Sequence, residues 1–490
     1  MRKLMMFCIV AVAVAVTVSA FAAVQNVKVS GDLALRNLNR KSFDMGPMAP
    51  GGVVDPNGRD DQHFLMNTAR VRIDADLTDN VSTVVRLVNE RDWDSAVNTY
   101  QVGVDTAYVT LKEFFYAPLT LTIGRQPIWW GKGFVVGSNG MAWDPAGSIL
   151  ANEYTSFTNF DAVRATLDYA PWTVDSFYSK LVNNATATNE DDVDVVGINV
   201  GYKFAEYNAE SEAYVVNIDR HGLDTTDGDP QKTTTFGLRG SMDPLANISL
   251  WAEGDYQIGH YNPAFMANSH PGPAGAVALA VLNTTRERKA WACDVGGEYR
   301  FSDYAWKPKL GGEYILYSGD SAPWQHSNST YRGWDPVLRG KYDTAIHEFQ
   351  GRVYRTYDEY DPAAFTNRQQ FAIFGVIKPL DTVAVNARYT HIRLHKGLGA
   401  SDSPDFGPPT SRSSHIGDEV DANLTYDYTE DVQFGLLGAI FLPGKYYDGG
   451  TGRNFTSPAL GGGLVSAMGV TDGKGNKTAS SLVGTVKVTF

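Results

Sequence analysis

The chain has 490 residues, a formal net charge of -13 at pH 7 and a slightly negative mean hydropathy. The acidic balance argues against a nucleic-acid partner, because a surface that binds phosphates needs an excess of basic residues. Cys293 is the one cysteine after residue 22, so the chain beyond that point cannot form an internal disulfide.

Residues 1–22 have the features of a cleavable secretory signal. Arg2 and Lys3 give a positive start, residues 4–18 carry no charge, and the segment ends in Ala20-Phe21-Ala22. A membrane anchor is the alternative, but the apolar run is short for a span of about 20 residues. We therefore expect a mature chain of residues 23–490. Within it, no apolar run is long enough to cross a bilayer as a helix.

The mature sequence alternates short strand-like segments with polar connections. In the clearest segment, Val71 and Ile73 alternate with Arg70, Arg72 and Asp74, and such a period of two places the two sets on opposite faces of a sheet. Eighteen segments of this kind follow one another, and we predict strands at 27–38, 63–77, 81–90, 102–112, 119–126, 160–169, 172–182, 193–204, 211–220, 233–241, 248–260, 289–301, 309–318, 367–377, 382–394, 416–428, 432–442 and 479–490.

The connections between these strands differ in length by parity. Odd-to-even connections are long, as at 39–62, 127–159 and 319–366, whereas even-to-odd connections are short, as at Thr78-Asp79-Asn80. Transmembrane β-barrels have short periplasmic turns and long extracellular loops, and only closure satisfies the edges of a sheet in lipid. The fold class is therefore all-β: one antiparallel transmembrane barrel of about 18 strands in a Gram-negative outer membrane.

The last strand ends on Phe490. It resembles the closing strand of bacterial outer-membrane barrels, which implies the barrel assembly machinery as a partner alongside membrane lipid.

If the apolar face of each strand meets lipid, the other face lines the lumen. Charges on the lipid face cost about 2–4 kcal/mol each near the midplane for Arg or Lys, so alternation assigns the charged side chains to the interior. The pore-lining candidates are Lys28, Arg36, Arg70, Arg72, Arg86, Arg164, Arg239, Arg388, Asp74, Glu253, Asp255, Glu298, Glu419 and Asp421. The alternative for these residues is pairing across neighbouring strands as structural ladders.

A barrel of this width encloses water unless something plugs it, so passage of solutes is the expected activity. The nearly balanced lining predicts weak ion selectivity, with a local positive strip on the first three strands. Trp251 faces inward and is the candidate for stacking on a sugar ring. In the longest loop, 319–366, His326-Ser327 is the only pair that could indicate a hydrolase site, and no nucleophile motif supports one. The acidic residues 190–194 and 224–229 could bind Ca²⁺ through clustered oxygens, but solvated acidic loops are commoner. We therefore expect no catalytic residue, metal or cofactor.

Two motifs carry a family resemblance. Residues 121–126, Leu-Thr-Ile-Gly-Arg-Gln, followed by Trp129-Trp130-Gly131, look like the Gly-Arg-Gln strand of the alginate-export family of outer-membrane barrels. Residues 416–421 with 441–444 resemble the penultimate hairpin of that family. The resemblance implies a barrel that passes a polyuronate through an arginine-rich lumen, with Arg125 as a further pore-lining residue and Glu419 and Asp421 as acidic partners.

Arg125 has an alternative reading as an ion pair that holds a loop against the wall. The balanced lining and the Trp129-Trp130 pair depart from the family pattern, which leaves the cargo open between polysaccharide and small, possibly anionic, solutes. Two hypotheses follow: a passive outer-membrane channel, or a surface or structural barrel whose pore is blocked by its loops.

Overall fold

The computed structural model describes residues 26–42, 61–93, 102–138, 154, 159–182, 193–220, 231–261, 286–321, 330–336, 338–350, 365–397, 413–446 and 478–490. The expected signal peptide, most of the two acidic loop pieces and the His326-Ser327 pair lie outside these residues. That the mature chain starts at Ala23 stays a prediction.

Eighteen strands form one sheet, which confirms the predicted fold class and strand count. They are β1 (Asn26–Lys41), β2 (Gln62–Thr78), β3 (Val81–Asp92), β4 (Gly103–Leu111), β5 (Leu119–Gln126), β6 (Phe160–Tyr169), β7 (Trp172–Val182), β8 (Val193–Lys203), β9 (Glu210–Arg220), β10 (Gln231–Leu245), β11 (Ile248–Tyr261), β12 (Arg286–Arg300), β13 (Lys309–Tyr317), β14 (Arg368–Leu380), β15 (Val383–Leu394), β16 (His415–Asp427), β17 (Val432–Pro443) and β18 (Ala479–Thr489).

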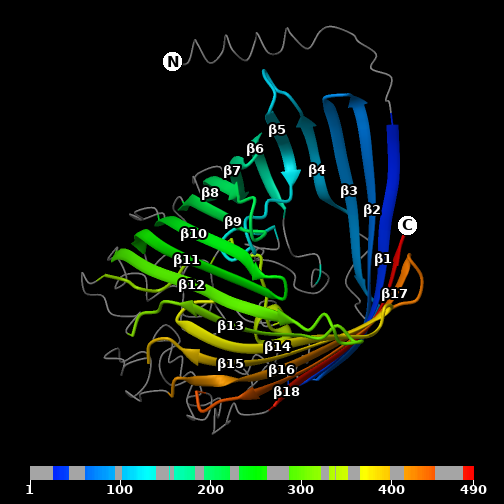
Figure 1. The fold of residues 1–490 in the computed structure, drawn as a ribbon, viewed down its shortest axis with the longest axis vertical. Coiled ribbons are helices and arrows are strands. Elements are labelled where there is room, and N and C mark those ends of the chain that lie inside the picture. Colours follow the sequence, from blue (N-terminus) through cyan, green and yellow to red (C-terminus); the bar gives the residue numbers. More distant parts are fainter. Residues whose placement is uncertain are drawn as a thin grey trace, which may run out of the picture.

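Each strand pairs antiparallel with its neighbours in the sequence, and the series closes because β1 also pairs with β18. Figure 1 shows the strands following one another round the barrel from β1 in blue to β18 in red. Beyond the end of β18, the Phe490 and Gly31 backbones exchange two hydrogen bonds, at 2.8 and 3.0 Å. Closure leaves no strand edge unpaired, as a sheet in lipid requires.

The two faces of the strands differ as the alternation predicts. Val71 and Ile73 of β2 are exposed on the outside, whereas Arg70 forms an ion pair with Asp32 of β1 on the inside, at 3.2 Å. Large exposed aromatic residues, including Trp172, Tyr299 and Tyr428, gather near the short turns. Such residues form the interfacial girdle of membrane barrels. Among the described residues, no helix has both the length and the apolarity needed to cross a membrane.

Candidate functional site

Two connecting segments lie against the inner wall of the barrel. Residues 127–138 follow β5, and residues 330–336 and 338–350 precede β14 and end in the short helix η2 (Ala345–Gln350). We call them the first and second inner segments. The amide of Gly137 in the first donates to the carbonyl of Leu338 in the second, at 2.8 Å. Both segments bury apolar side chains in one cluster with residues of the wall. The segment residues in this cluster include Ile128, Trp130, Phe134, Val136, Trp334 and Leu338.

Trp130 anchors the first inner segment to the wall. Its indole N–H donates to Asp175 Oδ2 of β7 at 2.7 Å, and its ring packs edge-on against Phe177, with ring centroids 5.2 Å apart. Arg164 of β6 holds the same carboxylate with two hydrogen bonds of 2.8 Å. A charged pair on the wall therefore fixes the aromatic anchor.

Asp335 anchors the second inner segment. Its carboxylate receives two hydrogen bonds from Arg220 of β9, at 2.8 and 3.0 Å, and one from the Thr233 hydroxyl at 2.9 Å. Gln257 of β11 bonds both the amide and the carbonyl of Asp335 at 2.9 Å. Burial alone would raise the pKa of Asp335, but Arg220 and Arg288 hold it below its ordinary value. The carboxylate thus stays charged in a buried site.

A second group of charges holds the same segment near its middle. Lys341 Nζ lies 2.6 Å from Asp294 and 2.7 Å from Glu313, and Arg388 of β15 donates to Glu313 at 2.7 Å. Burial opposes the charge on Lys341, but Asp343 and its other acidic neighbours raise its pKa. Burial also opposes ionisation of Asp343, yet Lys341 and Arg388 lower its pKa well below the ordinary value.

Glu419 of β16 fixes the end of the second inner segment. Its two carboxylate oxygens accept hydrogen bonds from the backbone amides of Ile346 and His347, at 2.6 and 2.9 Å. The fully buried Arg368 of β14 donates to Glu348 of η2 at 2.5 Å. Glu419 therefore holds the end of this segment against β16.

A cavity of about 470 Å³ lies on the periplasmic side of the inner segments. Asp243 and Ser249, which flank the short turn between β10 and β11, mark its periplasmic end, whereas Lys132 and Asp343 come from the inner segments. The remaining lining residues are Asn208, Arg239, Ser241, Met242, Leu250, Trp251, Glu298, Arg300, Glu313, Phe374 and Arg388. The cavity thus combines cations, acids and two aromatic rings.

Lys132 differs from the other cations of the cavity. Arg239, Arg300 and Arg388 each form ion pairs with wall carboxylates, but Lys132 forms none with a described residue. Its ammonium lies 3.2 Å from the centroid of the Trp251 ring. Burial, with a smaller effect of Lys341, lowers the pKa of Lys132 to about 8.

A strip of arginines covers the inner face of β1 to β3. Arg70, Arg72 and Arg86 remain partly exposed, and each pairs with a carboxylate on its own strand or a neighbouring one. Asp105 of β4 takes the Arg86 bond at 2.5 Å and also lies 3.9 Å from Arg70. The guanidinium groups are therefore present at the wall, with their charge already matched.

Most of the sequence-predicted residues lie on the inner face, as their pairing and contacts show, but they do not come together in one site. The cavity gathers three of them, Arg239, Glu298 and Arg388, together with Trp251, and the rest are spread along the wall or covered by the inner segments. Residues on the inner face are Lys28, Arg36, Arg70, Arg72, Arg86, Arg164, Arg239, Arg388, Asp74, Glu253, Asp255, Glu298, Glu419, Asp421 and Trp251. That any of them contacts a passing solute stays a prediction.

Arg125 is the exception. It lies directly opposite Asp161 on the strand face shared with the exposed Ile123 and Val163, and it pairs with Asp161 at 3.0 Å. The structure therefore places Arg125 on the outside of the barrel, and the expectation that it lines the pore is wrong. A charge here is tolerated because the residue is one from the end of β5, where the cost of exposing a charge is small.

Sequence reasoning missed Lys132, Asp335, Lys341 and Asp343, all of which lie in connections between strands. Strand alternation says nothing about such residues. The aromatic and glycine-rich run Trp129–Gly133 is the one local signal that the first segment has an apolar environment.

Comparison with known proteins gives a family and a fold. The family model described as alginate export matches residues 53–458. Among solved structures, the chain is similar to OccAB1 of Acinetobacter baumannii, at 11% identity and a TM-score of 0.53, and to OpdQ of Pseudomonas aeruginosa, at 10% identity and a TM-score of 0.50. Each alignment covers 96% of this chain and 99% of the other. No curated protein matches the sequence.

Proposed function

This chain belongs to the alginate export family and is an outer-membrane channel of porin-like fold, and from that premise we propose that its lumen passes small carboxylate-bearing solutes, acidic sugars in particular, by passive diffusion. The observation that carries the proposal is the Lys132–Trp251 pair at the cavity. Lys132 is a cation without a carboxylate partner among the described residues, held against an aromatic ring.

The pair provides the two contacts that an acidic sugar needs. A cation over an aromatic ring contributes about 0.5–2 kcal/mol, whereas a hydrogen bond to a charged group contributes about 1.5–3 kcal/mol. Lys132 can therefore exchange the Trp251 ring for a solute carboxylate at little net cost. When the ammonium swings away, the luminal face of the indole is free for the apolar face of a sugar ring.

The volume of the cavity favours small solutes. About 470 Å³ lies within the range of roughly 300–1,000 Å³ typical of sites for small molecules. The inner segments bound this space, and buried ion pairs and hydrogen bonds attach them to the wall. A thick polymer would have to detach those contacts, whereas a monosaccharide or disaccharide need not.

The same anchors favour a second candidate, a structural or partner-binding barrel whose inner segments block the pore. Planar-bilayer recording of the purified protein separates the two. Stepwise openings in salt support the channel, and silence at all voltages supports the blocked barrel.

Liposome swelling in glucuronate and in glucose then tests the solute class. We expect the uncharged Lys132→Gln variant to reduce glucuronate entry about tenfold, the loss of roughly 1.4 kcal/mol of attraction, while glucose entry changes little. Lys289→Gln is the matched control, because Lys289 lies on the outer face and pairs with Glu287. Equal glucuronate entry in the wild type and in Lys132→Gln would refute the role of Lys132.

A further inference from the structure

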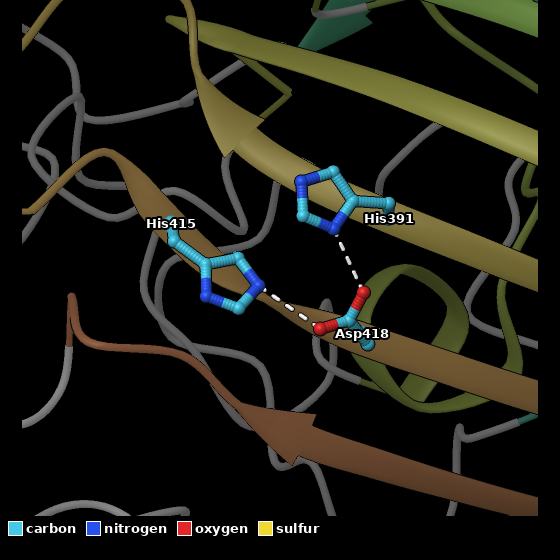
Figure 2. A group of neighbouring side chains, drawn as sticks. All are labelled: His391, His415 and Asp418. Atoms are coloured by element: carbon cyan, nitrogen blue, oxygen red, sulfur yellow. Dashed lines mark hydrogen bonds and ion pairs between the residues drawn. The ribbon is translucent and has the colours of Figure 1, made fainter.

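A cluster of two histidines and one aspartate lies on the wall away from the lumen. Figure 2 shows His391 of β15 and His415 of β16 directed at the carboxylate of Asp418. His391 Nδ1 lies 2.8 Å from Asp418 Oδ1, and His415 Nε2 lies 2.9 Å from Asp418 Oδ2. The three potential ligand atoms are all within 4.8 Å of one another.

The strand register places this cluster on the outside of the barrel. The neighbours of His391 on β15, Thr390 and Ile392, are fully buried on the inner face, and Tyr389 is exposed on the outer one. Asp418 is the cross-strand partner of His391. The cluster lies near the extracellular ends of β15 and β16, at their junctions with residues 395–414. It is therefore independent of the channel interior and of the function proposed above.

The donor set is that of a transition-metal site. Two imidazole nitrogens and one carboxylate oxygen are a three-ligand set for Zn²⁺, which leaves a fourth position for water. The imidazole rings lie nearly parallel, with centroids 4.9 Å apart and an interplanar angle of 21°, so both present a nitrogen to the same region. We propose that His391, His415 and Asp418 bind a divalent first-row cation, with Zn²⁺ as the best match.

The surroundings suit this role. Tyr389 donates its phenolic hydrogen to Asp418 Oδ1 at 2.6 Å, and such an outer partner orients a carboxylate ligand. Arg393 is the cross-strand partner of His415, and its guanidinium donates to the Ser414 hydroxyl at 3.2 Å. All three side chains of the cluster are partly exposed, at 33, 35 and 22%, so an ion can reach them from water.

Binding requires only a small adjustment. Metal bonds of about 2.0–2.2 Å would replace the two hydrogen bonds between the histidines and Asp418, and each imidazole would bind as its neutral form through the nitrogen that faces Asp418, with its one ring proton on the other nitrogen. His415 is the first residue of β16 and lies beside a register irregularity between the two strands. The bound ion would cross-link the two strands at the extracellular surface.

The test uses the full-length protein folded in detergent micelles. Addition of Co²⁺, which replaces Zn²⁺ and absorbs visible light, is expected to give a d–d absorption band that saturates at one equivalent and disappears on competition with Zn²⁺. We expect His391→Ala and His415→Ala to weaken binding at least about tenfold, and the double variant to abolish the band. For comparison, changing an outer-shell partner alone typically costs 10–100-fold in metal affinity.

His260→Ala is the matched control. His260 lies on the outer face of β11 and opposite a carboxylate residue, Glu287, but outside any cluster of three ligands found among the described residues. Asp418→Asn is a second variant that preserves the shape of the side chain while removing its charge. The heat-dependent gel migration of every variant reports whether the barrel has folded.

Absence of a Co²⁺ band in the folded wild type would overturn the proposal. So would equal binding by the wild type and the folded double variant, which would place the ion elsewhere. Retained binding in His260→Ala together with weakened binding in Asp418→Asn supports it. Because the readout is metal binding, failure of the channel proposal leaves this test unaffected.

Discussion

Asp335 and Arg220 form a two-point ion pair inside the barrel, with Oδ2 and Oδ1 at 2.8 and 3.0 Å from the guanidinium nitrogens. Breaking a buried pair by removing one charge costs about 3–5 kcal/mol. We therefore expect Asp335→Asn to release the second inner segment and to raise single-channel conductance or the frequency of large openings. Asp381→Asn, at an exposed periplasmic turn, is the control. Identical conductance traces for Asp335→Asn and the wild type would contradict this anchoring role.

Acid is expected to release the same segment. The pKa values of Asp335 and Asp343 are lowered in the folded chain, whereas an aspartate in an unfolded chain ionises near ~3.9. Their stabilising contribution is therefore fully present above about pH 4 and is lost as the pH falls through the lowered values. Any increase in single-channel conductance that these two carboxylates cause should therefore begin only below about pH 4. A conductance change that begins near neutral pH would exclude these two carboxylates as its cause.

The charge of Lys132 should govern anion preference in mild alkali. With a pKa lowered to about 8, Lys132 is mostly charged at neutral pH and loses its charge as the pH rises through that value. The reversal potential in a salt gradient should shift toward cation preference between about pH 7 and 9. The shift should be absent in Lys132→Gln and present in Lys289→Gln. A shift that persists in Lys132→Gln would assign it to another group.

Gly296 sets the position of the Trp251 ring. A Cβ at Gly296 would collide with the indole ring, and overpacking of this kind costs about 1–3 kcal/mol. We expect Gly296→Ala to displace the ring toward the lumen and to lower glucuronate entry in liposome swelling. Gly254→Ala is the control, because a Cβ there meets no atom within 4 Å. Unchanged entry in Gly296→Ala would argue against a part for Trp251 in passage.

Deletion of Phe490 should impair assembly of the barrel. Its backbone exchanges two hydrogen bonds with Gly31, which completes the closure of β18 on β1. We expect a several-fold lower amount of folded protein in the outer membrane, measured by heat-dependent gel migration of membrane fractions. Phe434→Ala removes a similarly exposed aromatic side chain from β17 without touching the closure. Equal losses in both variants would show that aromatic content, and not closure, matters.

Strand alternation predicted the fold and the facing of the wall residues, because a period of two is a local property. Arg125 shows the limit of a motif. The family resemblance assigns it to the pore. Its spacing of two and four residues from Ile123 and Leu121 instead places it on their face, the outside of the barrel, where the structure has it. Local backbone geometry was the better guide at this position.

The attachment of the inner segments to the wall could not be predicted from sequence. Arg220 and Asp335 are 115 positions apart, and the burial that makes their pair strong comes from the folded segment itself. The histidine cluster could not be predicted for the same reason, because His391 is distant in the sequence from the other two residues. His391 and Asp418 are 27 positions apart and meet only because of the register between β15 and β16.

The attachments of the inner segments are one-sided. Among the described residues, their hydrogen bonds and ion pairs to the wall reach β7 and β9 to β16, and none reaches the arginines of β2 and β3. In the described part of the chain, the wall at β2 and β3 therefore carries none of these attachments, and its charged groups are Arg70, Arg72 and Arg86 with their carboxylate partners. Because each guanidinium already has a carboxylate neighbour, we expect this part of the wall to attract an anion only weakly, so that it neither traps nor excludes one.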